Sequence, residues 1–203
     1  MLVLCGQGNP GARYAGNRHN IGFMAVDQIG RRWRFGPERS RFSSLVREGE
    51  IETPGGAVRA LILKPQTYYN ESGRAAAEAL KFYKLKPADL VLFYDEIDMA
   101  PGRFRMKTGG GAAGNNGVRS LTAHIGPDFR RARLGVGHPG HKDRVQGHVL
   151  SDFHKVDQQW VADLLGAVAD AAPLLAAGED EKYQTEVMRL APADKSDIPQ
   201  GRG

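Results

Sequence analysis

The chain has 203 residues, of which 41% are hydrophobic and 25% are charged, and its formal net charge at pH 7 is +5. These values are typical of a globular protein and exclude a disordered or fibrous one, and the length fits a single domain. No apolar run approaches the roughly 20 residues that span a bilayer. Because no leader segment follows Met1 and Cys5 is the only cysteine, we expect a cytoplasmic protein without a membrane segment or an internal disulfide.

Short apolar runs predict buried strands, and they alternate along the chain with amphipathic segments that predict helices. The expected strands are residues 2–5, 59–64, 90–95 and 132–137, and residues 42–48 should form a hairpin with residues 57–63. We expect a first helix capped by Asn17, a second that starts at Asn70 or Ser72, and a third over residues 152–177. This alternation predicts an α/β domain with a central mixed, largely parallel twisted sheet flanked by helices on both faces. We expect that domain to cover residues 1–190, and residues 191–203 to form a flexible C-terminal tail.

Charge is distributed unevenly along the chain. Residues 1–41 contain seven arginines and two acids, residues 103–144 contain nine basic side chains and two acids, and residues 151–203 contain ten acids and five bases. A basic body suggests an anionic partner, of which nucleic acid is the commonest large one. A solvated basic surface without a partner explains the same counts, so charge alone leaves both interpretations open.

The glycine-rich stretch GGGAAGNNG at residues 109–117 does not fit a phosphate-binding loop. A Walker loop needs Lys and Ser or Thr directly after its glycines, whereas Asn115 and Asn116 stand there. The spacing G-x-G-x-x-G does occur at residues 6–11, but Pro10 has no amide hydrogen to donate and favours a tight turn. Neither G-x-S-x-G nor H-E-x-x-H occurs, so we expect no nucleotide cofactor, serine nucleophile or metal centre.

General-base hydrolysis remains, in which an imidazole takes a proton from water. His19, within NRHN and beside a glycine-rich turn, is the best candidate for that base. A purely structural hydrogen-bonding role is the competing interpretation of His19.

Four segments, taken together, resemble the bacterial peptidyl-tRNA hydrolase family in order and spacing. They are GQGNPGARYAGNRHNIGF (6–23), KPQTYYNESG (64–73), YDEIDMAPG (94–102) and the stretch from GGGAAGNNG to GVGHPG (109–140). The resemblance covers roughly residues 1–175, and it implies hydrolysis of the ester that joins a peptide to tRNA. It also implies a monomer that needs no cofactor or protein partner and binds peptidyl-tRNA.

The resemblance assigns roles to individual residues. His19 matches the catalytic histidine of the family, and Asp95 matches the carboxylate that orients it, although Glu96 and Asp98 compete for that role on position alone. A carboxylate on one ring nitrogen fixes the tautomer and raises the basicity of the other nitrogen. Asn9, Asn70 and Asn116 match asparagines that line the cleft of the family, and Tyr14 and Tyr69 are expected to supply apolar walls. Lys107 and Arg133 match a basic pair that clamps the 5′ phosphate of tRNA.

The sequence departs from the motifs of the family at several positions. Members usually carry histidine where this chain has Asn115, methionine where it has Tyr69, and an apolar residue where it has Gln7. Ala100 replaces a common proline, and we expect the changes at Gln7 and Ala100 to be neutral. Because Asn115 does not titrate near neutrality, any acid, base or charge role of that histidine is lost. The alternative hypotheses are therefore an RNA-binding relative with weakened or lost hydrolysis and, less favoured, a nucleotide-binding enzyme.

Overall fold

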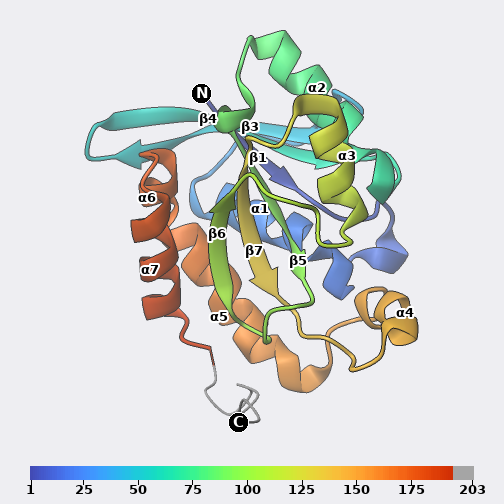
Figure 1. Ribbon diagram of the computed structural model, residues 1–203. Coiled ribbons are helices and arrows are strands. Elements are labelled where there is room, and N and C mark those ends of the chain that lie inside the picture. The colour runs from blue at the N-terminus through green and yellow to red at the C-terminus, as the bar shows by residue number, and fades with distance from the viewer. Residues whose placement is uncertain (194–203) are drawn as a thin grey trace.

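The computed structural model describes residues 1–193 of the chain, as seven strands and seven α-helices joined by short 3-10 turns (Figure 1). The strands are β1 (Leu2–Gly6), β2 (Arg39–Arg41), β3 (Ser44–Thr53), β4 (Gly56–Pro65), β5 (Leu90–Glu96), β6 (Phe104–Thr108) and β7 (Arg130–Gly135). The helices are α1 (Ile21–Arg32), α2 (Ser72–Tyr83), α3 (Asn116–Ile125), α4 (Val145–Val149), α5 (Gln158–Asp170), α6 (Ala172–Ala176) and α7 (Asp180–Leu190).

All seven strands form one mixed sheet in the order β2-β3-β4-β1-β5-β7-β6. The four central strands β4, β1, β5 and β7 run parallel, and antiparallel neighbours extend the sheet at both edges. The predicted hairpin is present, because β3 pairs with β4 from Ser44 opposite Pro65 to Thr53 opposite Gly56. The prediction of a mixed, largely parallel sheet is therefore confirmed.

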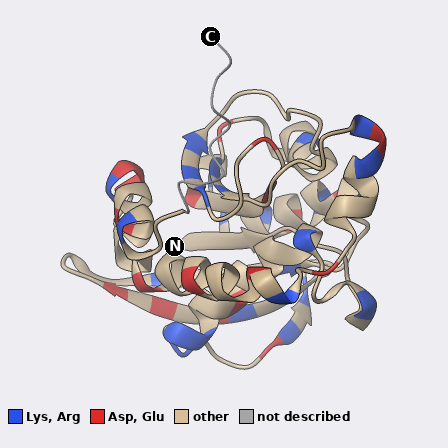
Figure 2. Ribbon diagram, turned by 90° about the horizontal axis from the view of Figure 1, so that it is seen from below, with Lys and Arg blue, Asp and Glu red and all other residues tan. Residues whose placement is uncertain are grey.

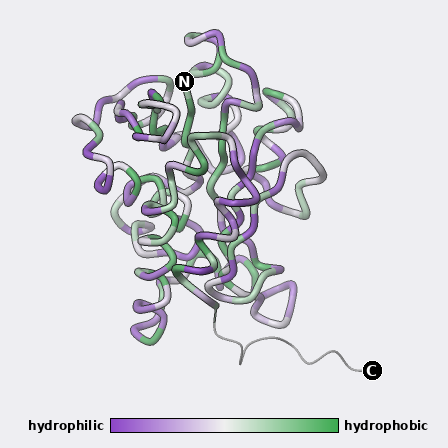
Figure 3. Tube along the Cα trace, turned by 90° about the vertical axis from the view of Figure 1, so that its left-hand side faces the viewer, coloured by the Kyte–Doolittle hydropathy of each residue, from purple (hydrophilic) through white to green (hydrophobic). Residues whose placement is uncertain are grey.

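Alternating side chains of the central strands feed two apolar layers, one on each face of the sheet. On β1, Leu2 and Leu4 pack with α1, α5, α6 and α7, whereas Val3 and Cys5 pack with α2 and α3. In Figure 3 the chain that leads inward from the N-terminus is green, as expected for the apolar strand β1. Helices thus cover both faces, as the sequence predicts, and the carboxyl ends of β1 and β5 open together at one edge of the sheet.

Two local predictions were wrong. The predicted helix 152–177 is divided into α5 and α6, because Pro173 has no amide hydrogen to continue α5, and residues 152–154 are not helical. Asn17 does not cap α1, which begins at Ile21; its side-chain amide donates to the Asp152 carboxylate at 2.7 Å instead. The helix expected to start at Asn70 or Ser72 is confirmed, because α2 begins at Ser72.

The remaining predictions concern the tail, the membrane and charge. Of the tail predicted at 191–203, residues 194–203 lie outside the described residues. Within residues 1–193, no helix combines the length and apolar character that a bilayer crossing requires. The hairpin strand β3 carries Glu48, Glu50 and Glu52, and red bands mark the hairpin in Figure 2, whereas β6 and β7 on the other side of the sheet carry mainly basic charges.

Candidate active site

His19 and Asp95 meet at the carboxyl end of β5. His19 lies in the 3-10 turn Arg18–Asn20 just before α1, and its Nδ1 is 2.8 Å from Oδ2 of Asp95. The Asp95 side chain is 2% exposed and that of His19 is 18% exposed, so the carboxylate is buried beneath an imidazole that solvent still reaches. Neither Glu96 nor Asp98 takes this place, because Glu96 binds Arg133 and the Asp98 backbone amide.

Close packing of α1 against the sheet brings the two side chains together. A Cβ atom at Gly22 would lie 2.2 Å from the Phe93 carbonyl oxygen and 2.6 Å from the Gln7 backbone nitrogen. No side chain fits in that space, so only glycine lets the start of α1 approach the ends of β1 and β5. This approach carries the turn that contains His19 over Asp95.

Tyr69 completes the surroundings of the pair. Its ring stacks on the His19 imidazole, with centroids 3.8 Å apart and planes inclined by 11°. Its hydroxyl donates to Oδ1 of Asp95 at 3.0 Å, and the residue is only 8% exposed. Burial, followed by the charge of Asp95, raises the pKa of Tyr69 well above its ordinary value. The hydroxyl therefore stays protonated and remains a donor to the carboxylate.

Asn115 connects the start of α3 to this group of side chains. Its Oδ1 accepts the backbone amide of Val118 at 3.0 Å and so caps α3. Its Nδ2 donates to the Tyr69 hydroxyl at 3.1 Å. A continuous hydrogen-bonded series therefore runs from Asn115 through Tyr69 and Asp95 to His19.

Asn70 and Asn116 adjoin members of this series in the sequence, and Asn9 is bonded to the residue that follows His19. The backbone of Asn9 exchanges two hydrogen bonds of 2.9 Å with the side chain of Asn20, the neighbour of His19. Asn70 follows Tyr69 and is exposed, and Asn116 follows Asn115 and accepts a 3.3 Å bond from Arg119. Tyr14 is half-buried, and its hydroxyl accepts a hydrogen bond from Arg13 at 2.5 Å.

The predicted phosphate clamp lies on the basic edge formed by β6 and β7. Lys107 is exposed and has no carboxylate partner among residues 1–193, while Arg133 binds Glu96 through Nε and Nη2 and leaves Nη1 available. Arg131, opposite Lys107 in the sheet, is 1% exposed and donates to the carbonyls of Gly110 and Gly111, both at 2.8 Å. Arg131 therefore shapes the glycine-rich loop between Lys107 and Asn116.

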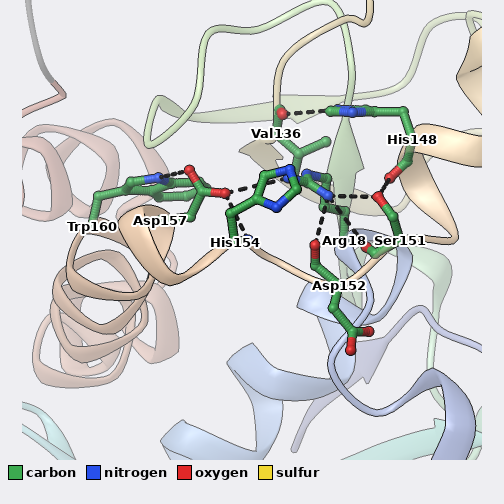
Figure 4. Close-up of polar contacts among 8 residues, drawn as sticks. All are labelled: Arg18, Val136, His148, Ser151, Asp152, His154, Asp157 and Trp160. Atoms are coloured by element: carbon green, nitrogen blue, oxygen red, sulfur yellow. Dashed lines mark hydrogen bonds and ion pairs between the residues drawn. The ribbon is translucent and has the colours of Figure 1, made fainter.

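Arg18 fixes the segment that precedes α5 against the turn containing His19 (Figure 4). Its guanidinium donates to Ser151 Oγ at 2.7 Å and to the Asp152 carbonyl at 2.8 Å, and it forms an ion pair with Asp157 at 3.3 Å. The Arg18 backbone amide also donates to the Ser151 carbonyl at 3.1 Å. The residue beside His19 is therefore held by chain that lies more than 130 positions later in the sequence.

Sequence reasoning missed the contacts made by Gln7 and Asn115. Gln7, expected to be neutral, is fully buried, and its Nε2 donates to the Tyr69 carbonyl at 3.0 Å and to Ser72 Oγ at 2.9 Å. Two departures from the family motifs, Gln7 and Asn115, therefore both contact a third, Tyr69. The signal in the sequence was that all three positions differ from the family motifs in the same chain, which is typical of residues that contact each other.

The arrangement suits removal of a proton from water. Asp95 occupies Nδ1 of His19, which leaves Nε2 on the partly exposed side of the ring as the nitrogen that can accept a proton. Uncharged amides surround the pair and can donate to a substrate without competing for that proton.

Comparisons with known proteins identify the family that the chain resembles over almost its whole length. A family model described as peptidyl-tRNA hydrolase matches residues 3–196. The peptidyl-tRNA hydrolase of Phenylobacterium zucineum is 73% identical over 97% of this chain and 94% of its own length, and that of Caulobacter vibrioides is 63% identical over 97% and 96%. A crystal structure of peptidyl-tRNA hydrolase from Acinetobacter baumannii superposes with a TM-score of 0.87 at 36% identity, covering 95% of this chain and 97% of that one.

Proposed function

This chain belongs to the peptidyl-tRNA hydrolase family and hydrolyses the ester between peptide and tRNA, and we propose that His19 is the base of that reaction. The observation that carries the proposal is the 2.8 Å contact between His19 Nδ1 and Asp95 Oδ2. Because Nδ1 is engaged by Asp95, Nε2 is the nitrogen left to take a proton from water.

The reaction begins when water attacks the ester carbonyl carbon and His19 Nε2 takes its proton. The developing positive charge on the imidazole is stabilised by the buried Asp95 carboxylate. Collapse of the tetrahedral intermediate breaks the bond to the ribose oxygen. The protonated imidazole then returns its proton to that oxygen, so free tRNA and free peptide leave.

Asn9, Asn70 and Asn116 position the substrate in this proposal. Their amides both donate and accept hydrogen bonds, which suits an ester, a peptide backbone and a ribose. Asn70 and Asn116 are exposed and adjoin Tyr69 and Asn115, so one of them can donate to the developing oxyanion. Tyr14 supplies an apolar wall in the same proposal.

Lys107 and Arg133 hold a tRNA phosphate away from the ester. Binding energy made at a distance positions the reacting bond and separates peptidyl-tRNA from other esters. The exposed ammonium of Lys107 and the free Nη1 of Arg133 support this role.

The test of the base is hydrolysis of a purified peptidyl-tRNA by the wild type and by His19→Ala. The proposal predicts that the wild type releases free tRNA and that His19→Ala loses at least about 1000-fold in kcat, because the base and its proton transfer are gone. His124→Ala is the matched control, since His124 is exposed on α3 and the only hydrogen-bond partner of its imidazole within residues 1–193 is the Ser120 carbonyl. Hydrolysis by His19→Ala at the wild-type rate would exclude His19 as the base.

The phosphate clamp has its own prediction. Lys107→Ala should weaken tRNA binding and lower the slope of log affinity against log salt by roughly one unit, because one fewer counterion is released. Arg59→Ala is the control, because Arg59 is exposed on β4 and pairs across the hairpin with Glu50, strands away from β6. Equal salt slopes for the wild type and Lys107→Ala would remove Lys107 from the clamp.

We also propose that the protein acts in the cytoplasm as a monomer, where translation supplies its substrate. The molar mass in solution tests the second part, and the value for one chain of 22.1 kDa is expected.

A further inference from the structure

Two side chains outside the proposed catalytic pair, one buried and one half-buried, hold Tyr69 in place. Gln7 holds the backbone of Tyr69 through its carbonyl, at 3.0 Å, and Asn115 holds the hydroxyl of Tyr69, at 3.1 Å. These contacts join residues that are 62 and 46 positions apart in the sequence. Distant parts of the chain therefore hold Tyr69 at its backbone carbonyl and at its hydroxyl.

The packing around Tyr69 leaves little freedom to move. A Cβ atom at Gly117 would lie 1.9 Å from Gln7 Nε2 and 2.8 Å from Tyr69 Cε1, so the first turn of α3 presses directly on both side chains. Asn115 caps the same turn. The start of α3 is thus packed to match Tyr69 and Gln7 together.

Tyr69 in turn contacts both members of the catalytic pair. Its ring lies parallel to the His19 imidazole at 3.8 Å, and its hydroxyl bonds the Asp95 oxygen that His19 does not use. Each oxygen of Asp95 therefore has a hydrogen-bond partner, and the ring of Tyr69 packs against one face of the imidazole. Rotation of either group would break a hydrogen bond or a stack.

We propose that Tyr69 is a positioning residue for the hydrolysis, held by Asn115 and Gln7, and that it fixes the orientation of His19 and Asp95. Asn115 presents its amide hydrogen to the lone pair of the Tyr69 oxygen, so the hydroxyl proton points to Asp95. Asn115 thus acts through Tyr69 and takes no proton itself. This inference rests on the proposed function, because it requires His19 to be the base.

The hydroxyl also determines how strongly Asp95 holds a protonated imidazole. A donor on Oδ1 withdraws negative charge from the carboxylate, so less charge faces His19. Without the hydroxyl, Asp95 stabilises the protonated imidazole more strongly, and a higher pH is needed to release the base. A residue that only fills space would leave the pH dependence unchanged.

The experiment is the pH dependence of kcat/KM on peptidyl-tRNA for Tyr69→Phe, which keeps the stacked ring and removes the hydroxyl. We expect kcat/KM on the plateau to fall about 10-fold, as for loss of a hydrogen bond to a charged group, with the rise of activity displaced to higher pH. Tyr83→Phe is the matched control, because its hydroxyl bonds the exposed Glu48 at 2.9 Å and lies outside the site. A thermal unfolding scan of each variant confirms that it is folded.

Asn115→Ser tests the connection to α3. Serine keeps a capping oxygen for the Val118 amide but is too short to reach the Tyr69 hydroxyl. We expect a loss of about 3-fold in kcat/KM, and we expect Tyr69→Phe/Asn115→Ser to be no worse than Tyr69→Phe alone, because Asn115 acts through the hydroxyl. Multiplying losses in the double variant would overturn this connection.

The outcomes separate this inference from the proposed function. If His19→Ala loses hydrolysis while Tyr69→Phe keeps the wild-type kcat/KM and pH dependence, Tyr69 has no positioning role and the base assignment stands. If His19→Ala retains hydrolysis, the proposed base is wrong, and the inference about Tyr69 fails with it.

Discussion

Asp95 is the residue that contacts both His19 and Tyr69 in the site. It accepts one hydrogen bond from Tyr69 and contacts His19 through its other oxygen, and its side chain is almost fully buried. A carboxylate in this position has no water to replace a lost partner, so its charge acts mainly on the imidazole. The nearby acids Glu96 and Asp98 do not contact the imidazole of His19.

The prediction at the scale of the residue concerns Asp95→Asn. The variant keeps the size of the side chain but carries no charge, and its amide group favours the wrong tautomer of His19, so kcat should fall about 100-fold or more. Asp98→Asn, which changes an exposed acid three positions later, should keep wild-type activity. Equal losses in the two variants would show that Asp95 has no special role.

Elements far apart in the sequence hold the site, and this limits what the sequence alone predicts. His19 and Asp95 follow from motifs because each lies in a short local pattern. The contacts of Gln7 with Tyr69, and of Arg18 with Ser151, depend on how distant elements pack, and no local pattern encodes them.

Weak local patterns explain why the sequence did not predict β6 and α7. β6 has only two apolar positions, Phe104 and Met106, among charged residues, which is too short for a clear alternation. α7 buries only Tyr183 and Val187 and is otherwise hydrophilic, so its helical period is barely visible. By contrast β1 and β5 are buried throughout, and their continuous apolar runs identified them at once.

The prediction at the scale of the element concerns Arg18, which joins the turn of His19 to the segment before α5. Arg18→Met should destabilise the protein by about 3 kcal/mol, because Asp157 and the carbonyl of Asp152 lose a buried partner. Arg32→Met is the control, since the ion pair of Arg32 with Asp170 is about half exposed and should contribute less than about 1 kcal/mol. Urea unfolding measures both, and equal effects would contradict the anchoring role.

The whole molecule is an α/β domain whose central strands were predicted from the sequence and whose two apolar layers were confirmed. Several acidic groups are enclosed in those layers in their neutral form. Burial raises the pKa of Cys5 to about 12 and raises the pKa of Tyr183 above its ordinary value. Burial, followed by the charge of Asp95, raises that of Tyr69.

Stability should therefore fall at alkaline pH. A group with a raised pKa in the folded state binds its proton more tightly there than in the unfolded chain, so its contribution is complete below about pH 9 and is lost as the pH rises toward 12. Urea unfolding at roughly pH 8, 9.5 and 11 measures this loss, and Cys5→Ala should reduce it. A free energy of unfolding that stays constant up to pH 11 would contradict the burial of these groups.

The central claim is that the imidazole of His19 removes the proton from water, and chemical rescue tests it most directly. Hydrolysis of peptidyl-tRNA by His19→Ala is measured with and without added imidazole across a range of pH. We predict almost no hydrolysis without imidazole, and partial recovery that follows the concentration of neutral imidazole. Hydrolysis by His19→Ala at the wild-type rate without imidazole would contradict the claim.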